Sequence, residues 1–333
     1  MEFASKRIGK TTLDVTLLGL GSATLGGHLN PITDADAGNL VAAAHDGGIR
    51  YFDAAPLYGH GRSEHMVGDK LRGHNDWILS TKVGRRLRPI RNGAEHIDPA
   101  ATPFPFEPYF DYSYDGTMRA YEDSLQRLGL ARIDMAFIHD IDIHTHGAET
   151  HLAVFETAMT GAYRALDELR SSGDIKAIGL GVNFVEPIVM ALDRGDWDCF
   201  LLAGRYTLLE QEPIHTLFPA VARHGASIVI GGPFNSGVLA GRDTWNYAKA
   251  PRSVVERVKA TSRVCDAHDV PMPAAALRFA AAHPLVASVI PGPRVTNELK
   301  QIFEWWNQDI PPALWTDLRT EELIDPDAPF PAT

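Results

Sequence analysis

Two ionisable side chains stand close together where the chain leaves an apolar segment. In the stretch RYFDAAPLYGHG, Asp53 follows two aromatic residues, and Tyr58 comes five positions later in a glycine-rich loop. A phenol has a reference pKa of about 10, so it exchanges a proton near neutrality only when a cation and a hydrogen-bond network support it. Either the pair belongs to a proton-transfer site, or Asp53 only caps the helix that follows.

Two further residues have the chemistry that such a phenol needs. Lys82 lies inside the apolar stretch LSTKV, and His139 ends the apolar stretch IDMAFIH. A lysine beside the phenol would stabilise the phenolate, an aspartate would keep that lysine charged, and a histidine could polarise a substrate oxygen. Together with Asp53 and Tyr58, these residues could form a proton relay for a carbonyl or an alcohol.

Short β-branched segments must position these residues. Eight strand-like segments alternate with helical patterns, at 16–23, 49–55, 77–83, 133–140, 176–182, 199–204, 226–233 and 286–292. Strands that alternate with helices favour a parallel sheet, and eight such units without a flexible linker favour one closed (β/α)8 TIM barrel. We therefore expect a single domain over residues 1–333, with its site at the carboxyl ends of the strands.

Three segments depart from a plain barrel. Residues 85–113 are too long and proline-rich for an ordinary connection, so we expect a lid or pocket wall on the catalytic face. Residues 234–271 form a second elaboration that contains at least one helix. Residues 6–15, KRIGKTTLDV, are expected to form a β-hairpin that closes the bottom of the barrel.

Composition argues against several classes of partner. The 333 residues carry a formal net charge of −11 without a run of Lys and Arg, which argues against nucleic acid. Cys199 and Cys265 lie far apart with no CxxC spacing, so neither a disulfide framework nor a thiolate metal site is expected. With no apolar stretch of about 18 residues and no signal-peptide pattern, we expect a cytoplasmic protein without a membrane partner. The oligomeric state stays open.

The run HDIDIHTH, residues 139–146, raises the question of a metal. It contains three histidines and two aspartates, which are metal-ligand types. The competing interpretation is a catalytic histidine followed by a polar loop, since a metal-dependent barrel would need ligands from further strands. We predict no metal.

Residues 14 to 305 resemble the aldo-keto reductase family, a TIM barrel that uses a nicotinamide cofactor. The motifs that carry the resemblance are FDAAPLYG, LSTKVG, SLQRLGLARIDMAFIHD and IPGPR, in this order and spacing. The resemblance implies that the catalytic tetrad is Asp53, Tyr58, Lys82 and His139. It also implies that Asn183 binds the carboxamide of the cofactor.

The same resemblance implies further cofactor contacts. It gives them as Gly232, Pro233, Gly237, Leu239, Gly292, Arg294 and Glu298. The chain departs from the family at Gly231, where the family has an aromatic residue that stacks on the nicotinamide, so another group must hold that face. Gly292 and Glu298 replace a phosphate-binding Lys and Arg. Because an acidic Glu298 should repel a 2′-phosphate, we expect NAD as the cofactor, with NADP possible.

The segments DYSYDGTMRAYEDSLQRLG, AGRYTLLEQ and GGPFNSGVLAG are most similar to the branch that holds L-fucose (D-threo-aldose) 1-dehydrogenases and pyridoxal 4-dehydrogenase. The resemblance therefore implies oxidation of the anomeric hydroxyl of an aldose to a lactone, with Tyr58 as the general acid/base. From their positions, Arg205 and Trp245 are expected to contact the substrate.

Four alternatives stay open at this point. Two are a pyridoxal 4-dehydrogenase and an NADPH-dependent reductase of small aldehydes. The third is a nicotinamide-sensing regulatory subunit, which need not retain the tetrad. The fourth is a barrel hydrolase, which would require a second strand-end acid besides Asp53.

Overall fold

Eight parallel strands form the central sheet of the computed structural model, which describes residues 2–27, 31–91 and 104–331. The strands are β3 (Leu20–Gly21), β4 (Tyr51–Asp53), β5 (Ile78–Val83), β8 (Met135–His139), β9 (Ala177–Val182), β10 (Cys199–Ala203), β11 (Ser227–Gly231) and β14 (Val286–Ile290). Each lies inside one of the segments that the sequence predicted. Their order in the sheet follows their order in the chain.

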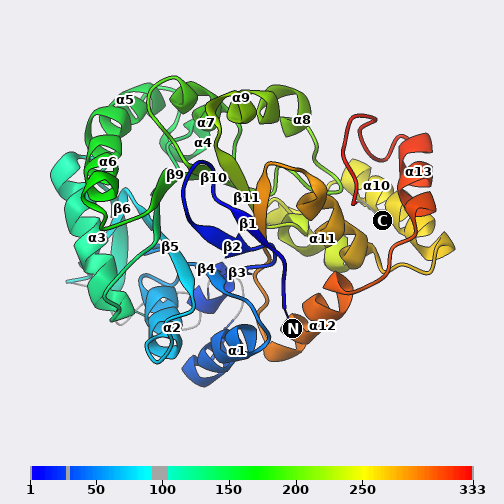
Figure 1. The fold of residues 1–333 in the computed structure, drawn as a ribbon, viewed down its shortest axis with the longest axis horizontal. Helices are drawn as coiled ribbons and strands as arrows, with labels where there is room; N and C mark the ends of the chain where they lie inside the picture. Colours follow the sequence, from blue (N-terminus) through cyan, green and yellow to red (C-terminus); the bar gives the residue numbers. More distant parts are fainter. Residues whose placement is uncertain (1, 28–30, 92–103, 332–333) are drawn as a thin grey trace.

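The first and last strands of the sheet meet and close it. Leu18, just before β3, forms a parallel bridge with Val289 in β14. The backbone N–H groups of Gly19 and Gly21 donate to the carbonyls of Val289 and Pro291, at 2.9 and 3.0 Å. Closure leaves the sheet without an open edge. With helices around the strands (Figure 1), the fold is the predicted (β/α)8 TIM barrel.

Helices cover the outside of the barrel. They are α1 (Asp34–Asp46), α2 (Arg62–Leu71), α3 (Tyr114–Leu128), α4 (Ile143–His146), α5 (His151–Thr157), α6 (Tyr163–Ser172), α7 (Glu186–Leu192), α8 (Pro213–Thr216), α9 (Phe218–His224), α10 (Arg252–Ala267), α11 (Met272–Ala282), α12 (Thr296–Trp306) and α13 (Pro312–Thr320). Local chemistry sets their ends: Ser113 Oγ accepts from the Gly116 N–H at 3.1 Å where α3 begins, and Gly129 at φ 60° ends it. Among the described residues, no helix has the length and apolarity to cross a membrane.

An N-terminal hairpin plugs the amino end of the barrel, as the sequence predicted. Strands β1 (Ser5–Arg7) and β2 (Asp14–Thr16) pair antiparallel, and Figure 1 shows the hairpin, in blue, across the end of the barrel. Ile8, Leu13 and Val15 are buried in one cluster with barrel residues such as Phe137. The apolar side chains of the hairpin therefore fill the bottom of the barrel, and the opposite end is left for the site.

Both predicted elaborations follow carboxyl ends of strands, which places them on the catalytic face. After β5, the structure forms an antiparallel ribbon of β6 (Arg85–Pro89) and β7 (Phe106–Phe110), where the sequence predicted a loop. The prolines are tolerated because a two-stranded ribbon leaves outer N–H positions unpaired. Residues 92–103 of this elaboration lie outside the described residues. After β11 come a 3₁₀ segment η4 (Asn235–Ala240), the hairpin of β12 (Thr244–Trp245) and β13 (Ala248–Lys249), and the predicted helix, α10.

Candidate active site

A buried ion pair lies at the carboxyl ends of β4 and β5. Lys82 Nζ donates to Asp53 Oδ2 at 2.6 Å and to the carbonyl of Ala54 at 3.0 Å. Ser80 Oγ donates to the other oxygen of Asp53 at 2.6 Å. The ammonium also lies 4.8 Å from the centroid of the Tyr58 ring. The pair therefore holds a fixed positive charge directly beside the phenol.

The loop that carries Tyr58 is held by a close backbone contact. Gly59 has φ +64°, and a Cβ on it would lie 2.5 Å from the carbonyl oxygen of Gly26. Only glycine fits such an approach in a left-handed conformation. The Ser63 N–H then donates to the carbonyl of Tyr58 at 3.1 Å where α2 begins. These contacts fix Tyr58 against the end of β4, above Lys82.

His139 completes the cluster from the end of β8. Its ring meets the Tyr58 ring edge to face, with centroids 6.2 Å apart. Burial, with Arg85 and Lys82 nearby, lowers the pKa of His139 well below its ordinary value, so the ring is neutral at neutral pH. Its Nδ1 is buried and has no hydrogen-bond partner in the described part of the chain. The structure thus brings all four predicted tetrad residues together.

The acidity of Tyr58 differs from the sequence-based expectation. We expected the ammonium to make the phenol more acidic, but burial raises the pKa of Tyr58 to about 12, and Lys82 only partly offsets it. Burial alone would lower the pKa of Lys82, but Asp53 and Tyr58 together raise it above its ordinary value. The resting site therefore pairs a neutral phenol with a charged ammonium.

A second buried network, missed from the sequence, surrounds Asp140. Its Oδ2 accepts from Arg85 Nη2 at 2.7 Å and lies 3.4 Å from His139 Nε2. Its Oδ1 accepts from Asn183 Nδ2 at 3.3 Å, which leaves the Asn183 amide oxygen facing Tyr247, whose hydroxyl donates to it at 3.4 Å. The sequence does contain a signal for this network, because Asp140 directly follows His139 at the end of a predicted strand. Asp140 thus links His139, the histidine of the predicted tetrad, to the asparagine expected to bind the carboxamide.

The other histidines of the run 139–146 have separate partners. His144 stacks on Phe184 with centroids 3.9 Å apart, and His146 Nε2 lies 3.1 Å from the hydroxyl of Tyr112. Within the described residues, no side chain of this run belongs to a group of three closely spaced metal-ligating atoms. Packing and hydrogen bonding account for these two rings.

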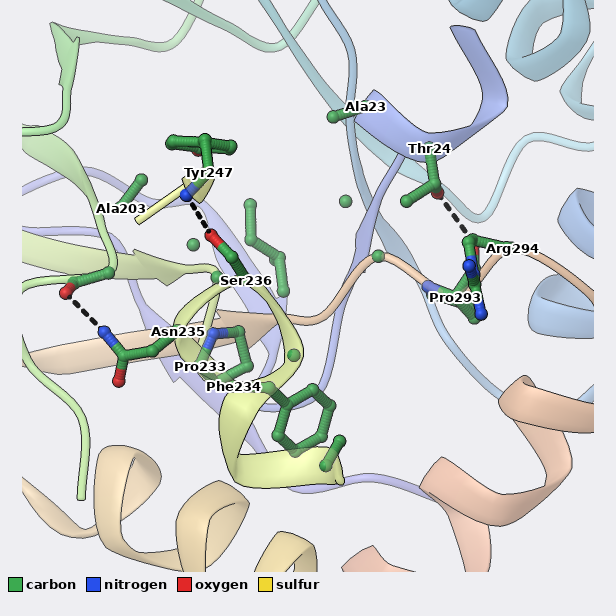
Figure 2. Close-up of a pocket in the computed structure, with 18 of the residues that line it drawn as sticks. Ala23, Thr24, Ala203, Pro233, Phe234, Asn235, Ser236, Tyr247, Pro293 and Arg294 are labelled. Carbon is green, nitrogen blue, oxygen red and sulfur yellow. Dashed lines mark hydrogen bonds between the residues drawn. The ribbon is translucent and has the colours of Figure 1, made fainter. Parts of the chain in front are cut away.

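A cavity of about 600 Å³ opens beside the relay (Figure 2). Its volume is typical of a small-molecule site. The ends of β10 and β11 present bare backbone to it at Gly204, Gly231 and Gly232. The predicted residues that line it are Asp53, Tyr58, Asn183, Arg205, Gly232, Pro233, Gly237, Gly292, Arg294 and Glu298.

Four predicted residues are not among those that line the cavity: Lys82 and His139, which lie next to Tyr58, and Leu239 and Trp245. Leu239 is fully buried in the core, and its N–H donates to the carbonyl of Phe234 at 3.2 Å. Trp245 packs its side chain against the core, and the next two residues of the hairpin turn, Asn246 and Tyr247, line the cavity in its place. The lining residues that sequence reasoning missed also include Ser22, Thr24, Phe234, Asn235, Arg242, Gln301 and Trp305.

Glu298 does not stand alone at the far end of the cavity. Its Oε1 accepts from Arg294 Nη2 at 2.7 Å and from Arg242 Nη2 at 2.9 Å. Burial would raise the pKa of Glu298, but the two guanidinium groups hold it below its ordinary value. Two cations share one carboxylate, so this cluster carries a net positive charge. Glu298 is therefore not an isolated charge, and the expectation that it disfavours a 2′-phosphate stays a prediction.

Fold and site together define a (β/α)8 barrel with a buried cluster of Asp53, Tyr58, Lys82 and His139 beside a cavity at the carboxyl ends of its strands. Residues 17–320 match the sequence model of the Aldo/keto reductase family, and the chain belongs to this family. It is an NAD(P)-dependent oxidoreductase.

Individual relatives cover nearly the whole chain. It is 43% identical to a pyridoxal 4-dehydrogenase of Microbacterium luteolum, over 96% of this chain and 97% of the relative. It is 34% identical to a D-threo-aldose 1-dehydrogenase of a Pseudomonas species, over 94% and 95%. Among solved structures, the holo form of aldo-keto reductase AKR11C1 from Bacillus halodurans superposes with a TM-score of 0.76 at 25% identity, covering 97% of both chains.

Proposed function

We propose that this chain is a dehydrogenase that oxidises the hydroxyl-bearing carbon of a cyclic hemiacetal to a lactone. The observation that carries the proposal is the buried relay of Asp53, Lys82 and Tyr58 beside a cavity of about 600 Å³. An aldose has such a carbon at its anomeric position. Pyridoxal acquires one when its aldehyde closes onto the neighbouring hydroxymethyl group. Both substrates named by the two relatives therefore offer the same reacting group.

The sequence identities to the two relatives set the order in which we propose these two substrates. The 43% identity to a pyridoxal 4-dehydrogenase exceeds the 34% identity to a D-threo-aldose 1-dehydrogenase. Pyridoxal is therefore our first candidate and an aldose the second, which reverses the order expected from the sequence motifs.

The cavity suits a nicotinamide dinucleotide. In Figure 2, it extends from the turn at Tyr247 to Thr24 and Arg294 on the other side. Asn183 offers an amide oxygen to a carboxamide at one end, and the positive cluster of Arg242, Arg294 and Glu298 offers guanidinium groups to phosphate at the other. We propose NAD as the preferred form, because a 2′-phosphate would have to compete with Glu298 for both arginines.

In the proposed reaction, residues of this chain accept the proton of the substrate hydroxyl and bind its oxygen. When bound, the nicotinamide supplies the hydride chemistry. Tyr58 Oη, as the phenolate, takes the proton of the substrate hydroxyl and becomes a neutral phenol, and the Lys82 ammonium stabilises that phenolate before the proton arrives. A neutral His139 holds the same substrate oxygen through a ring N–H. Because burial raises the pKa of Tyr58 to about 12, the phenolate that accepts this proton is the minor form near neutral pH and becomes more populated as the pH rises.

A substrate panel tests the proposal. Pyridoxal, L-fucose, D-arabinose and L-galactose are each incubated with NAD and with NADP, and the absorbance of reduced nicotinamide is followed. Mass spectrometry then identifies the lactone. A small aldehyde with NADPH tests the reductase alternative in the same assay. If none of the hemiacetals yields reduced nicotinamide, the proposal is wrong.

A further inference from the structure

The tip of the β12–β13 hairpin presents an aromatic ring that the proton relay does not use. Tyr247 lines the cavity, yet it is 69% exposed. Both turn residues have left-handed backbones, with φ 47° at Asn246 and 66° at Tyr247, which residues other than glycine rarely adopt. The Tyr247 N–H donates to Ser236 Oγ at 2.9 Å and holds the turn in place (Figure 2). A strained turn that exposes a large ring beside a cavity points to a ligand that covers the ring.

The position of the ring specifies which part of a ligand it would meet. The Tyr247 hydroxyl donates to Asn183 Oδ1 at 3.4 Å, so the ring lies at the end of the cavity that holds the asparagine. Figure 2 shows Thr24 and Arg294 on the far side of the cavity from Tyr247. A dinucleotide with its phosphates near Arg294 would thus bring its nicotinamide, and not its adenosine, to Tyr247.

The other aromatic side chains of the cavity already have partners. Four others line it besides Tyr247. Phe234 and Trp305 pack against each other with ring centroids 5.9 Å apart, and Phe184 stacks on His144 with centroids 3.9 Å apart. The Lys82 ammonium lies 4.8 Å from the centroid of the Tyr58 ring. In the described part of the chain, no ring or cation packs on Tyr247. Gly231, at the end of β11, contributes no side chain to the cavity wall. Tyr247 therefore has the one unpaired aromatic face among the described lining residues.

We propose that Tyr247 supplies the aromatic surface against which the nicotinamide ring of the bound cofactor packs. This inference rests on the proposed function, because it requires a nicotinamide cofactor in the cavity. It assigns to a hairpin turn the contact that β11 cannot make at Gly231. The carboxamide would replace the Tyr247 hydroxyl at Asn183 Oδ1, so the hydroxyl itself is dispensable and the ring is not.

Calorimetric titration with a matched pair of ligands tests the inference. NAD and ADP-ribose differ only in the nicotinamide, so a contact to that ring affects NAD alone; NADP and its 2′-phosphorylated ADP-ribose form a second pair. In Tyr247→Gly, the left-handed backbone becomes unstrained, and thermal melting checks the fold. We expect the Kd for NAD to rise about tenfold and that for ADP-ribose to stay within about twofold. Tyr247→Phe should bind NAD as the parent protein does.

A control and the contrary outcomes complete the test. Lys249→Ala changes an exposed residue of the same hairpin and should leave both affinities unchanged. Equal weakening of NAD and ADP-ribose in Tyr247→Gly, or unchanged NAD affinity with a raised KM for the substrate, would overturn the inference and leave the proposed function standing. If the parent protein binds neither dinucleotide, the proposed function fails together with the inference.

Discussion

Nζ of Lys82 lies 2.6 Å from Oδ2 of Asp53, and both side chains are almost completely removed from solvent. A buried ammonium is costly without a partner, so the carboxylate keeps Lys82 charged and also fixes its position. The charge lies 4.8 Å from the centre of the Tyr58 ring. Asp53 therefore acts on the phenol through Lys82, and the expected effects of changing each residue differ.

Tyr58→Phe removes the proposed proton carrier and keeps the ring. We expect kcat to fall by about 10²–10⁴-fold, because a positioned general acid/base contributes about that much. The Kd for NAD should stay nearly unchanged. Steady-state kinetics and calorimetry measure the two quantities, with Tyr109→Phe on the β6–β7 ribbon as the control. Retained turnover would exclude Tyr58 as the proton carrier.

The raised pKa of Tyr58 predicts the pH dependence of oxidation. The reaction needs Tyr58 in its proton-accepting form, and its pKa is about 12 in the free enzyme. The value of kcat/KM should therefore rise with pH over the whole range in which the protein is stable. Lys82→Met removes the charge that lowers this pKa, so oxidation should be slower at every pH. A plateau below about pH 9 in the parent enzyme would contradict this assignment.

The sequence predicted the features that depend on local pattern. The eight strands follow β-branched runs, and Asp53, Lys82 and His139 lie in those runs at the ends that a barrel brings together. The contacts that it missed join distant segments: Arg85 reaches Asp140 across 55 positions. The left-handed turn at Tyr247 contains no glycine that would indicate it in the sequence. Because of this turn, Asn246 and Tyr247 line the cavity in place of Trp245. The acidity of Tyr58 depends on a balance between burial and charge that residue types alone do not fix.

The buried ion pair of Arg85 and Asp140 predicts strong coupling in a double-mutant cycle. Their side chains are 16% and 8% exposed, and Arg85 Nη2 lies 2.7 Å from Asp140 Oδ2. Arg85→Met leaves the carboxylate buried without its cation, which should lower the free energy of unfolding by about 3–5 kcal/mol. Adding Asp140→Asn should recover a large part of that loss. Urea unfolding measures each variant, and simple additivity of the two changes would show that the pair is not coupled.

Glu298→Gln tests how the arginine cluster selects the cofactor. The carboxylate now accepts from Arg242 and Arg294 at 2.9 and 2.7 Å, which leaves one net positive charge. Removing the negative charge should favour NADP over NAD by about fivefold, a change of about 1 kcal/mol for one charge near solvent. Calorimetric Kd values for both cofactors give the ratio. Gln301→Glu, one helical turn further along α12, is the opposite change and should favour NAD. An unchanged ratio in both variants would exclude this cluster as the selecting element.

Gly9 links the stability of the barrel to its N-terminal hairpin. It has φ +46°, and a Cβ on it would lie 2.4 Å from the carbonyl oxygen of Asp198. Its N–H donates to Ser227 Oγ at 2.6 Å, so the hairpin cannot move away without losing this hydrogen bond. Gly9→Ala should therefore lower the free energy of unfolding by about 2–4 kcal/mol through backbone strain and overpacking.

A second glycine separates these two causes. Gly173 also has a left-handed backbone, at φ +88°, but a Cβ on it would meet no atom within 4 Å. Gly173→Ala should thus show only the cost of the backbone conformation, about 1 kcal/mol. The difference between the two variants in urea unfolding measures the contact of Gly9 with the strand that begins after Asp198. Since the hairpin closes the end of the barrel opposite the relay, kcat of folded Gly9→Ala should equal that of the parent. Equal destabilisation by the two changes would mean that the hairpin adjusts freely and does not brace the barrel.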